Sequence, residues 1–173
     1  TPTIDSLNKF NVFKENSFSY DSSYLNIDKN NNIMLDGFFQ SYKYFDDIKN
    51  EIINIFSLTK LQDSIITKKY KELCGKYSKI TSIHIRRGDY LKYQDLHRIL
   101  PLSYYLESIK KIDSYTELYL IFSDDIEWCK QYFPSILNKP YKFVYNDNIT
   151  DLILMSRCNN NIIANSSFSW WSA

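Results

Sequence analysis

The second half of the chain alternates short apolar runs with segments that have the pattern of helices. Four runs predict buried strands, because they are brief, nearly all apolar and rich in β-branched or aromatic residues; they are residues 80–86, 117–122, 141–144 and 161–164. The segments between and after them have helical spacing or helix-capping residues; these are residues 101–112, 123–133, 150–158 and 166–173. Strand–helix alternation with apolar strands predicts an α/β fold, namely a Rossmann-type doubly wound parallel sheet.

The first 75 residues follow a weaker pattern. They are polar at first, and a strand-like run that leads into a glycine turn follows at residues 33–39. Residues 44–74 then have a helical pattern, within which residues 58–73 are expected to form a separate second helix. The polar residues that include Gly75 predict a domain boundary at residues 75–79. We therefore expect a partial N-terminal region over residues 1–75 and a second domain over residues 76–173.

Composition and motif searches exclude several classes of protein. The chain has 173 residues and a formal net charge of +1, so no overall basic character predicts binding to nucleic acid. Three cysteines without metal-binding spacing favour reduced thiols over a disulfide framework or a zinc site. No apolar run approaches the ~18 residues of a membrane-spanning helix. The absence of GxGxxG, Walker, HExxH and GxSxG motifs argues against dehydrogenase, P-loop, metalloprotease and α/β-hydrolase functions.

Charged and hydroxyl residues follow three of the four expected strands at the point where each strand ends. Ligands of open α/β sheets bind beyond the carboxyl ends of the strands, so these residues are expected to share one site. Strand alternation places His84 and Arg86 on one face of the sheet and Arg87 on the other. Gly88 allows a sharp turn directly after the strand. The three groups are residues 84–89, 123–125 and 165–167.

The residue types at these strand ends indicate a nucleoside diphosphate site. Arg86 can donate two parallel hydrogen bonds to a phosphate. Ser166 and Ser167 open an expected helix, whose free backbone N–H groups and dipole favour an anion. An aspartate at the third strand end, Asp125 or its neighbour Asp124, can accept two hydrogen bonds from the N1–H and exocyclic amine of guanine.

Simpler interpretations of the same residues stay open. Arg86 and Asp89 could form a structural ion pair, and residues 123–125 could be an ordinary helix cap. The RGD tripeptide at residues 87–89 follows a strand rather than standing at a loop tip, which disfavours an integrin ligand. The adjacent pair Asp124 and Asp125 lacks the spacing of a metal site. His97 lies in a loop, where a surface histidine is the plainer interpretation.

Four ordered segments resemble the successive motifs of the α-1,2-fucosyltransferases of glycosyltransferase family 11. The resemblance extends over about residues 33–173. It is carried by DGFFQSYKYF, HIRRGDY, FSDDIEW and IIANSSFSWWSA, at residues 36–45, 84–90, 122–128 and 162–173.

This resemblance implies a GT-B-like architecture of two Rossmann-type domains. Residues 76–173 would be a C-terminally incomplete GDP-fucose-binding domain, and residues 1–75 part of the acceptor domain, because family members extend beyond both ends of the match. The implied reaction transfers fucose from GDP-fucose to the 2-hydroxyl of a galactose-terminated glycan, with inversion and without a divalent metal or other cofactor. Bacterial and viral members are cytoplasmic, which is the expected location here; a Golgi membrane anchor ahead of Thr1 is the alternative.

The resemblance also implies donor-binding roles, with His84 and Arg86 on the GDP, Ser166 and Ser167 near the diphosphate, and Asp125 or Asp124 on guanine. For the reaction we expect Arg86 to stabilise charge on the leaving diphosphate. Asp89 is the first candidate for the general base, with His97 or a residue outside this chain as the alternatives. The other functions left open are a truncated, non-catalytic nucleotide-sugar-binding protein and a fucosyltransferase of α-1,6 or O-linked specificity. The residues expected to bind the donor are His84, Arg86, Arg87, Asp124, Asp125, Ser166 and Ser167.

Overall fold

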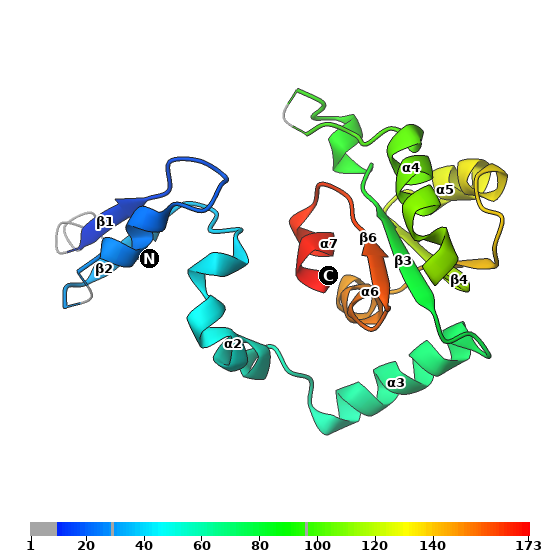
Figure 1. The fold of residues 1–173 in the computed structure, drawn as a ribbon, viewed down its shortest axis with the longest axis horizontal. Coiled ribbons are helices and arrows are strands. Elements are labelled where there is room, and N and C mark those ends of the chain that lie inside the picture. The colour runs from blue at the N-terminus through cyan, green and yellow to red at the C-terminus, as the bar shows by residue number, and fades with distance from the viewer. Residues whose placement is uncertain (1–9, 29, 96) are drawn as a thin grey trace. The chain divides into compact units, whose positions relative to one another are not determined.

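The computed structural model describes residues 10–28, 30–95 and 97–173 (Figure 1). The chain forms two compact units, Thr1–Ser57 and Leu58–Ala173. This division lies before the second of the two expected N-terminal helices, whereas the expected domain boundary is at residues 75–79. The reason is that this helix packs against the sheet of the second unit, through the buried side chains of Ile66 and Cys74.

The first unit is built on two short parallel strands. Strand β1 was not expected, because its region is polar, yet it pairs with β2 in register from Asn11 opposite Ile33. The Glu15 carboxylate, directly after β1, accepts hydrogen bonds from the backbone N–H groups of Phe38 and Phe39. The elements are β1 (Asn11–Lys14), η1 (Ser22–Asn26), β2 (Ile33–Asp36), η2 (Tyr42–Tyr44), η3 (Asp46–Ile48) and α2 (Lys49–Ile55).

The second unit contains a parallel sheet of four strands in its described part, in the order β5-β4-β3-β6. The chain moves from β3 outward to β5 and then returns to place β6 on the free side of β3 (Figure 1). The direction of winding thus reverses between β3 and β6, which is where open α/β sheets form their ligand crevice. The strands are β3 (Ile80–Ile85), β4 (Leu118–Ser123), β5 (Tyr141–Val144) and β6 (Asn160–Ile162).

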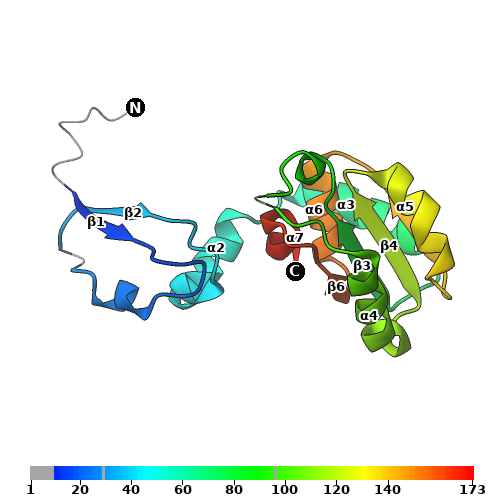
Figure 2. The ribbon, with the colours of Figure 1, turned by 90° about the horizontal axis from the view of Figure 1, so that it is seen from above.

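Helices cover both faces of this sheet, which confirms the expected α/β class with a parallel sheet and is compatible with a Rossmann-like fold. Figures 1 and 2 show α6 and α7 on one side of β3, and α4 and α5 on the other. The helices are α3 (Lys60–Cys74), α4 (Leu102–Ile112), α5 (Ile126–Tyr132), α6 (Asn148–Ser156) and α7 (Ser167–Ser172), with one-turn helices η4 (Asp89–Leu91), η5 (Asp113–Tyr115) and η6 (Phe133–Ser135).

Alternation along the strands divides the hydrophobic core into two layers. Ile80, Leu120 and Phe122 pack against α3 and α6, whereas Ile83 and Ile121 pack against α4 and α5. Each fully buried side chain of this size contributes roughly 1.5–3 kcal/mol to stability. Two buried layers explain why the strands are apolar on both faces, and they fix the direction in which residues beyond each strand end point.

Local signals set the limits of α3. Thr59 and Gln62 form a reciprocal capping box at its start. At its end Gly75 has a φ of 57°, a left-handed conformation that glycine adopts without strain. These signals allow the chain to enter β3 five residues later in a fixed direction.

Three further properties concern the described residues as a whole. All three cysteines, at positions 74, 129 and 158, are buried and free. Across the described ranges no helix combines the length and apolar character needed to cross a membrane. Nor do three or more His, Cys, Asp or Glu side chains gather there in a group that could hold a metal ion.

Candidate functional site

A cavity of about 290 Å³ lies at the carboxyl edge of the sheet, where the direction of winding reverses between β3 and β6. Most of the residues expected to bind the donor line it: His84, Arg86, Asp124, Ser166 and Ser167. A hollow of about 590 Å³ is larger, but it is formed by one surface of α3 alone and therefore cannot enclose a ligand between elements. The cavity at the strand ends is the candidate site because separate elements converge on it.

His84 contributes a buried imidazole to this cavity. Its residue is only 5% exposed, its ring packs against Phe168 with centroids 5.3 Å apart, and its Nδ1 atom is buried without a hydrogen-bond partner among the described residues. The pKa of His84 is lowered to about 4, chiefly by burial; the charge of Asp124 opposes this shift and that of Arg86 adds to it. His84 is therefore neutral at pH 7 and offers one donor and one acceptor nitrogen.

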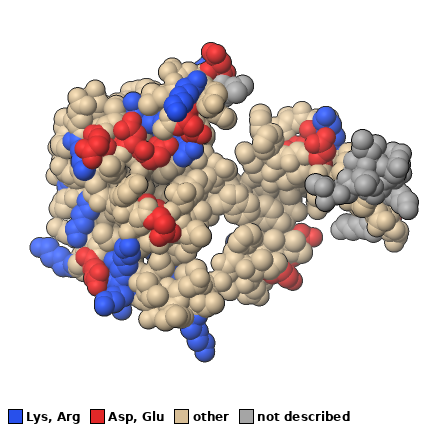
Figure 3. Space-filling view, turned by 180° about the vertical axis from the view of Figure 1, so that it is seen from behind, with Lys and Arg blue, Asp and Glu red and all other residues tan. Residues whose placement is uncertain are grey.

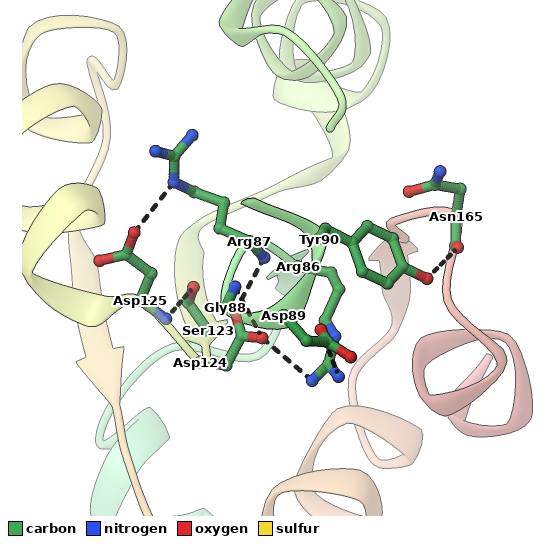
Figure 4. Close-up of polar contacts among 9 residues, drawn as sticks. All are labelled: Arg86, Arg87, Gly88, Asp89, Tyr90, Ser123, Asp124, Asp125 and Asn165. Atoms are coloured by element: carbon green, nitrogen blue, oxygen red, sulfur yellow. Dashed lines mark hydrogen bonds and ion pairs between the residues drawn. The ribbon is translucent and has the colours of Figure 1, made fainter. Parts of the chain in front are cut away.

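Arg86 lies on the same face of the sheet and forms two ion pairs. One guanidinium nitrogen is 2.8 Å from Asp89 Oδ1, and the other is 3.0 Å from Asp124 Oδ2 (Figure 4). The structure thus contains the Arg86–Asp89 ion pair that is one of the simpler interpretations of these residues. Because a guanidinium carries five N–H groups, these two pairs still leave donors for a ligand.

Arg87 and Asp125 form a pair of their own on the opposite side of β3, as strand alternation predicts. Arg87 Nε donates to Asp125 Oδ2 at 3.0 Å, and its guanidinium stacks 4.1 Å from the ring centroid of Trp128. Asp125 also caps α5 by accepting from the Trp128 N–H. Figure 4 shows the guanidinium groups of Arg86 and Arg87 pointing apart. Neither Arg87 nor Asp125 lines the cavity, so their expected contacts with a substrate stay a prediction.

Asp89 and His97 lie beside the cavity rather than on its wall. The Asp89 side chain is about half exposed and faces Arg86. His97 is exposed and stacks on Tyr90, with ring centroids 4.5 Å apart and an interplanar angle of 14°. Asp89, the expected general base, thus lies next to the expected diphosphate site. His97 is held by its aromatic contact with Tyr90.

Ser166 and Ser167 line the cavity at the start of α7. Ser166 occupies the N-cap position, and its side chain makes no capping hydrogen bond to the helix. Its hydroxyl is therefore not used in the way that a serine at this position usually is. Both residues therefore share the cavity with His84 and Arg86 from the end of β3, as the converging strand ends predict.

One wall of the cavity was missed from the sequence. Asp151 on α6 accepts hydrogen bonds from the Asn146 side chain at 2.7 Å and from the Asn146 backbone N–H at 3.2 Å. Burial raises the pKa of Asp151, and the Asn146 hydrogen bonds partly offset the shift. The missed signal was the polar run directly after the 141–144 strand, the fourth strand end. The wall residues are Tyr145, Asn146, Asn148 and Asp151.

Charge is mixed over the face of the molecule in Figure 3, where positive and negative side chains lie next to one another on the larger body. This agrees with the net charge of +1. Neither the overall charge nor this face therefore indicates binding of an anion, and any such preference would depend on the residues that line the cavity.

Comparison with known proteins identifies relatives of this chain. Residues 8–173 match the sequence profile of Glycosyl transferase family 11. The O-antigen biosynthesis glycosyltransferase WbnK of Escherichia coli is 33% identical over 155 residues, covering 83% of this chain and 50% of the relative. An alpha-1,2-colitosyltransferase of Escherichia coli is 37% identical over 145 residues, covering 79% and 49%.

A more distant relative is galactoside alpha-(1,2)-fucosyltransferase 1 of Bos taurus, which is 22% identical over 157 residues, covering 82% of this chain and 43% of the relative. The chain thus spans about half the length of the curated relatives it matches. No solved structure matches it.

Proposed function

Since the chain belongs to glycosyltransferase family 11, we propose that the protein transfers fucose from GDP-fucose to the 2-hydroxyl of a galactose-terminated glycan, with inversion. The observation that carries the proposal is the convergence of Arg86, Ser166 and Ser167 on one cavity at the reversal point of the sheet. A forked cation and two hydroxyl groups suit a diphosphate. A volume of about 290 Å³ suits part of a nucleotide sugar rather than all of it.

Recognition of the base is better assigned to Asp151 than to Asp125. The carboxylate of Asp125 is engaged with Arg87 and the α5 cap, outside the cavity. The Asp151 carboxylate is on the cavity wall, where it accepts hydrogen bonds from the side chain and the backbone N–H of Asn146. Asp151 can still accept from the N1–H and exocyclic amine of guanine, because each carboxylate oxygen has two lone pairs.

The proposed reaction is a direct displacement at the anomeric carbon of fucose. The acceptor 2-hydroxyl oxygen forms the new bond, the bond to the β-phosphate oxygen breaks, and GDP leaves with the electron pair. Arg86 stabilises the charge that develops on the β-phosphate, so the reaction is proposed to need no divalent metal. Neutral His84 can donate one further hydrogen bond to the leaving group. Asp89 is proposed to take the acceptor proton.

The proposed architecture is of the GT-B type. The sheet of residues 58–173 would contribute part of the GDP-fucose domain, and the first unit part of the acceptor side. The support is the family membership together with the division of the chain into two units.

Two measurements test the proposed function. Isothermal titration should show that the protein binds GDP at least tenfold more tightly than UDP; equal affinities would contradict the guanine assignment. Incubation of GDP-fucose with a galactose-terminated oligosaccharide, followed by linkage analysis, should give an α-1,2 product. An α-1,6 or O-linked product would replace the proposed specificity. Binding of GDP without transfer, with every acceptor tried, would indicate a non-catalytic binding protein.

A second donor is favoured by one observation, the 37% identity to an alpha-1,2-colitosyltransferase. Colitose is fucose without its 3-hydroxyl group, so the two GDP-sugars share the diphosphate and base contacts. A site that forms a hydrogen bond with the 3-hydroxyl discriminates strongly against the sugar that lacks it. Competition between GDP-fucose and GDP-colitose in one transfer assay decides which donor the protein uses.

A further inference from the structure

Asp124 stands at the centre of the turn that carries Arg86. Its Oδ1 atom accepts from the Arg87 backbone N–H at 2.9 Å, and its Oδ2 atom accepts from the Gly88 N–H at 3.1 Å. The same Oδ2 atom lies 3.0 Å from Nη1 of Arg86 (Figure 4). The side chain is about one-quarter exposed, so these interactions are partly shielded from water. One carboxylate thereby fixes the backbone of the turn and the direction of its arginine.

The turn leaves no space for a side chain at the point where Asp124 approaches. A Cβ atom added at Gly88 would lie 2.7 Å from Asp124 Oδ2 and 3.1 Å from its Cγ atom. Both atoms belong to the carboxylate that binds the turn, so a larger residue would displace that carboxylate. Gly88 is therefore required by this close approach.

The register of the sheet explains the arrangement. In the β3–β4 pair His84 lies opposite Phe122 and Ile85 opposite Ser123. Continued one residue beyond the strands, the same register places Arg86 opposite Asp124, and these two form an ion pair. Continued by a second residue, it places Arg87 opposite Asp125, which also form an ion pair. Since successive side chains point to opposite faces, the first pair faces the cavity and the second packs beside α5.

We propose that Asp124 is a positioning residue, which holds Arg86 so that its remaining N–H groups point at the diphosphate, and that it does not itself read the base. The inference rests on the proposed function for the identity of the anion. It predicts a change in GDP affinity of the opposite sign to the change that simple electrostatics predicts. Removing a negative charge beside an anion site would by itself tighten GDP binding, whereas loss of the positioning contact weakens it.

The test is a double-mutant cycle in GDP affinity, measured by isothermal titration. Asp124→Asn and Arg86→Lys are each expected to weaken binding at least tenfold. If Asp124 acts through Arg86, the double variant binds within about threefold of Arg86→Lys alone, because the two residues form one unit. Unchanged or tighter binding by Asp124→Asn, or losses that multiply in the double variant, would overturn the inference.

A matched control comes from the opposite edge of the sheet. Asp113 forms an ion pair with Lys139 and accepts a hydrogen bond from the Tyr119 hydroxyl. Asp113→Asn should leave GDP affinity within twofold, which excludes a general effect of losing a paired carboxylate. If Asp124→Asn does not fold, Gly88→Ala replaces it, with the same tenfold loss expected and unchanged affinity as the contradicting result.

A spectroscopic measurement separates this inference from the proposed function. In nitrogen-15 spectra the Nε–H signal of Arg86, assigned by its loss in Arg86→Lys, should be sharp in the unmutated protein. It should broaden in Asp124→Asn, because the guanidinium then loses its ion pair with Asp124 and keeps only the one with Asp89. If the unmutated protein binds no GDP, the proposed function fails and this signal alone decides the role of Asp124. A signal that stays sharp in Asp124→Asn would overturn the positioning role of Asp124.

Discussion

The hydroxyl group of Tyr90 donates a hydrogen bond to the backbone carbonyl of Asn165 across 3.0 Å, and so joins the turn after β3 to the turn after β6. Tyr90 is buried, and the Asn165 side chain is held in turn by the carbonyl of Arg98. The two turns carry Arg86 and Ser166, which both line the cavity. Their separation is therefore fixed by a contact that lies outside the cavity wall.

Tyr90→Phe removes this hydrogen bond and keeps the ring that stacks on His97. We expect a two- to tenfold loss of GDP affinity and a decrease of about 1 kcal/mol in the free energy of unfolding. Titration with GDP and urea unfolding measure the two effects. Tyr93→Phe, at an exposed tyrosine of the same segment, is the control. Equal GDP affinities for Tyr90→Phe and the unmutated protein would show that the turns keep their places without this bond.

Arg86→Lys replaces a fork by a single ammonium group. Because the lysine cannot donate two parallel hydrogen bonds, kcat/KM with GDP-fucose should decrease at least tenfold. Arg157→Lys is the matched control, since Arg157 pairs with Asp63 and does not line the cavity. Transfer kinetics of both variants provide the measurement. Normal kinetics for Arg86→Lys would remove Arg86 from the stabilisation of the leaving group.

Asp151→Asn should reduce discrimination between guanine and hypoxanthine. A carboxylate accepts from both N1–H and the exocyclic amine of guanine, whereas an amide offers a single acceptor atom. We expect the preference for GDP over IDP to decrease at least fivefold. Competitive titration measures it, and Asp147→Asn, at the N-cap of the same helix, is the control. A preference that is retained in Asp151→Asn would place base recognition elsewhere.

Asp89→Asn tests the general base. If the Asp89 carboxylate accepts the acceptor proton, kcat should decrease at least a hundredfold while GDP affinity changes less than threefold. Single-turnover transfer and GDP titration separate the two effects. Full transfer by Asp89→Asn would end the assignment, and His97→Gln would then be the next variant to measure.

The buried imidazole of His84 predicts a pH dependence of stability. The pKa of His84 is about 4 in the folded protein, below its ordinary value of 6.5. Between these two values the unfolded chain binds more protons, so stability decreases as the pH falls from 6.5 towards 4. From pH 7 to pH 5 this residue should contribute a loss of about 2 kcal/mol.

Urea unfolding at pH 7, 6 and 5 measures this loss. His84→Gln should show a flatter profile than the unmutated protein over this range. His97→Gln, at the exposed histidine, should show the same profile as the unmutated protein and is the control. Identical profiles for the unmutated protein and His84→Gln would show that His84 titrates normally.

The strands of the second unit could be predicted because they are buried on both faces, which makes them short and continuously apolar. Strand β1 could not, since its pattern is exposed, exposed, partly buried and exposed. The two compact units also meet between Ser57 and Leu58 and not at the expected residues 75–79, because Gly75 ends a helix that belongs to the second unit. A glycine signals a turn, whereas the packing of Ile66 on the sheet decides to which unit the helix belongs.

The candidate site could be predicted to the level of the strand ends and their alternation. His84, Arg86, Ser166 and Ser167 needed only the rule that parallel strands end at one edge. The choice between Asp125 and Asp151 as the base-recognition residue depends on tertiary contacts. Asp125 binds Arg87 outside the cavity, whereas α6 places Asp151 on the cavity wall. Sequence patterns give the direction of a side chain and leave open which partner it meets.

Helix α3 packs against the sheet although it precedes Gly75. It therefore decides at which residue a stable fragment of the second unit can begin. A fragment that begins at residue 58 keeps Ile66 and Cys74 over the sheet and should yield a well-dispersed NMR spectrum suited to ligand titrations. A fragment that begins at residue 76 lacks this helix and exposes an apolar surface formed by Ile80, Leu118 and Leu120. It should therefore aggregate on expression.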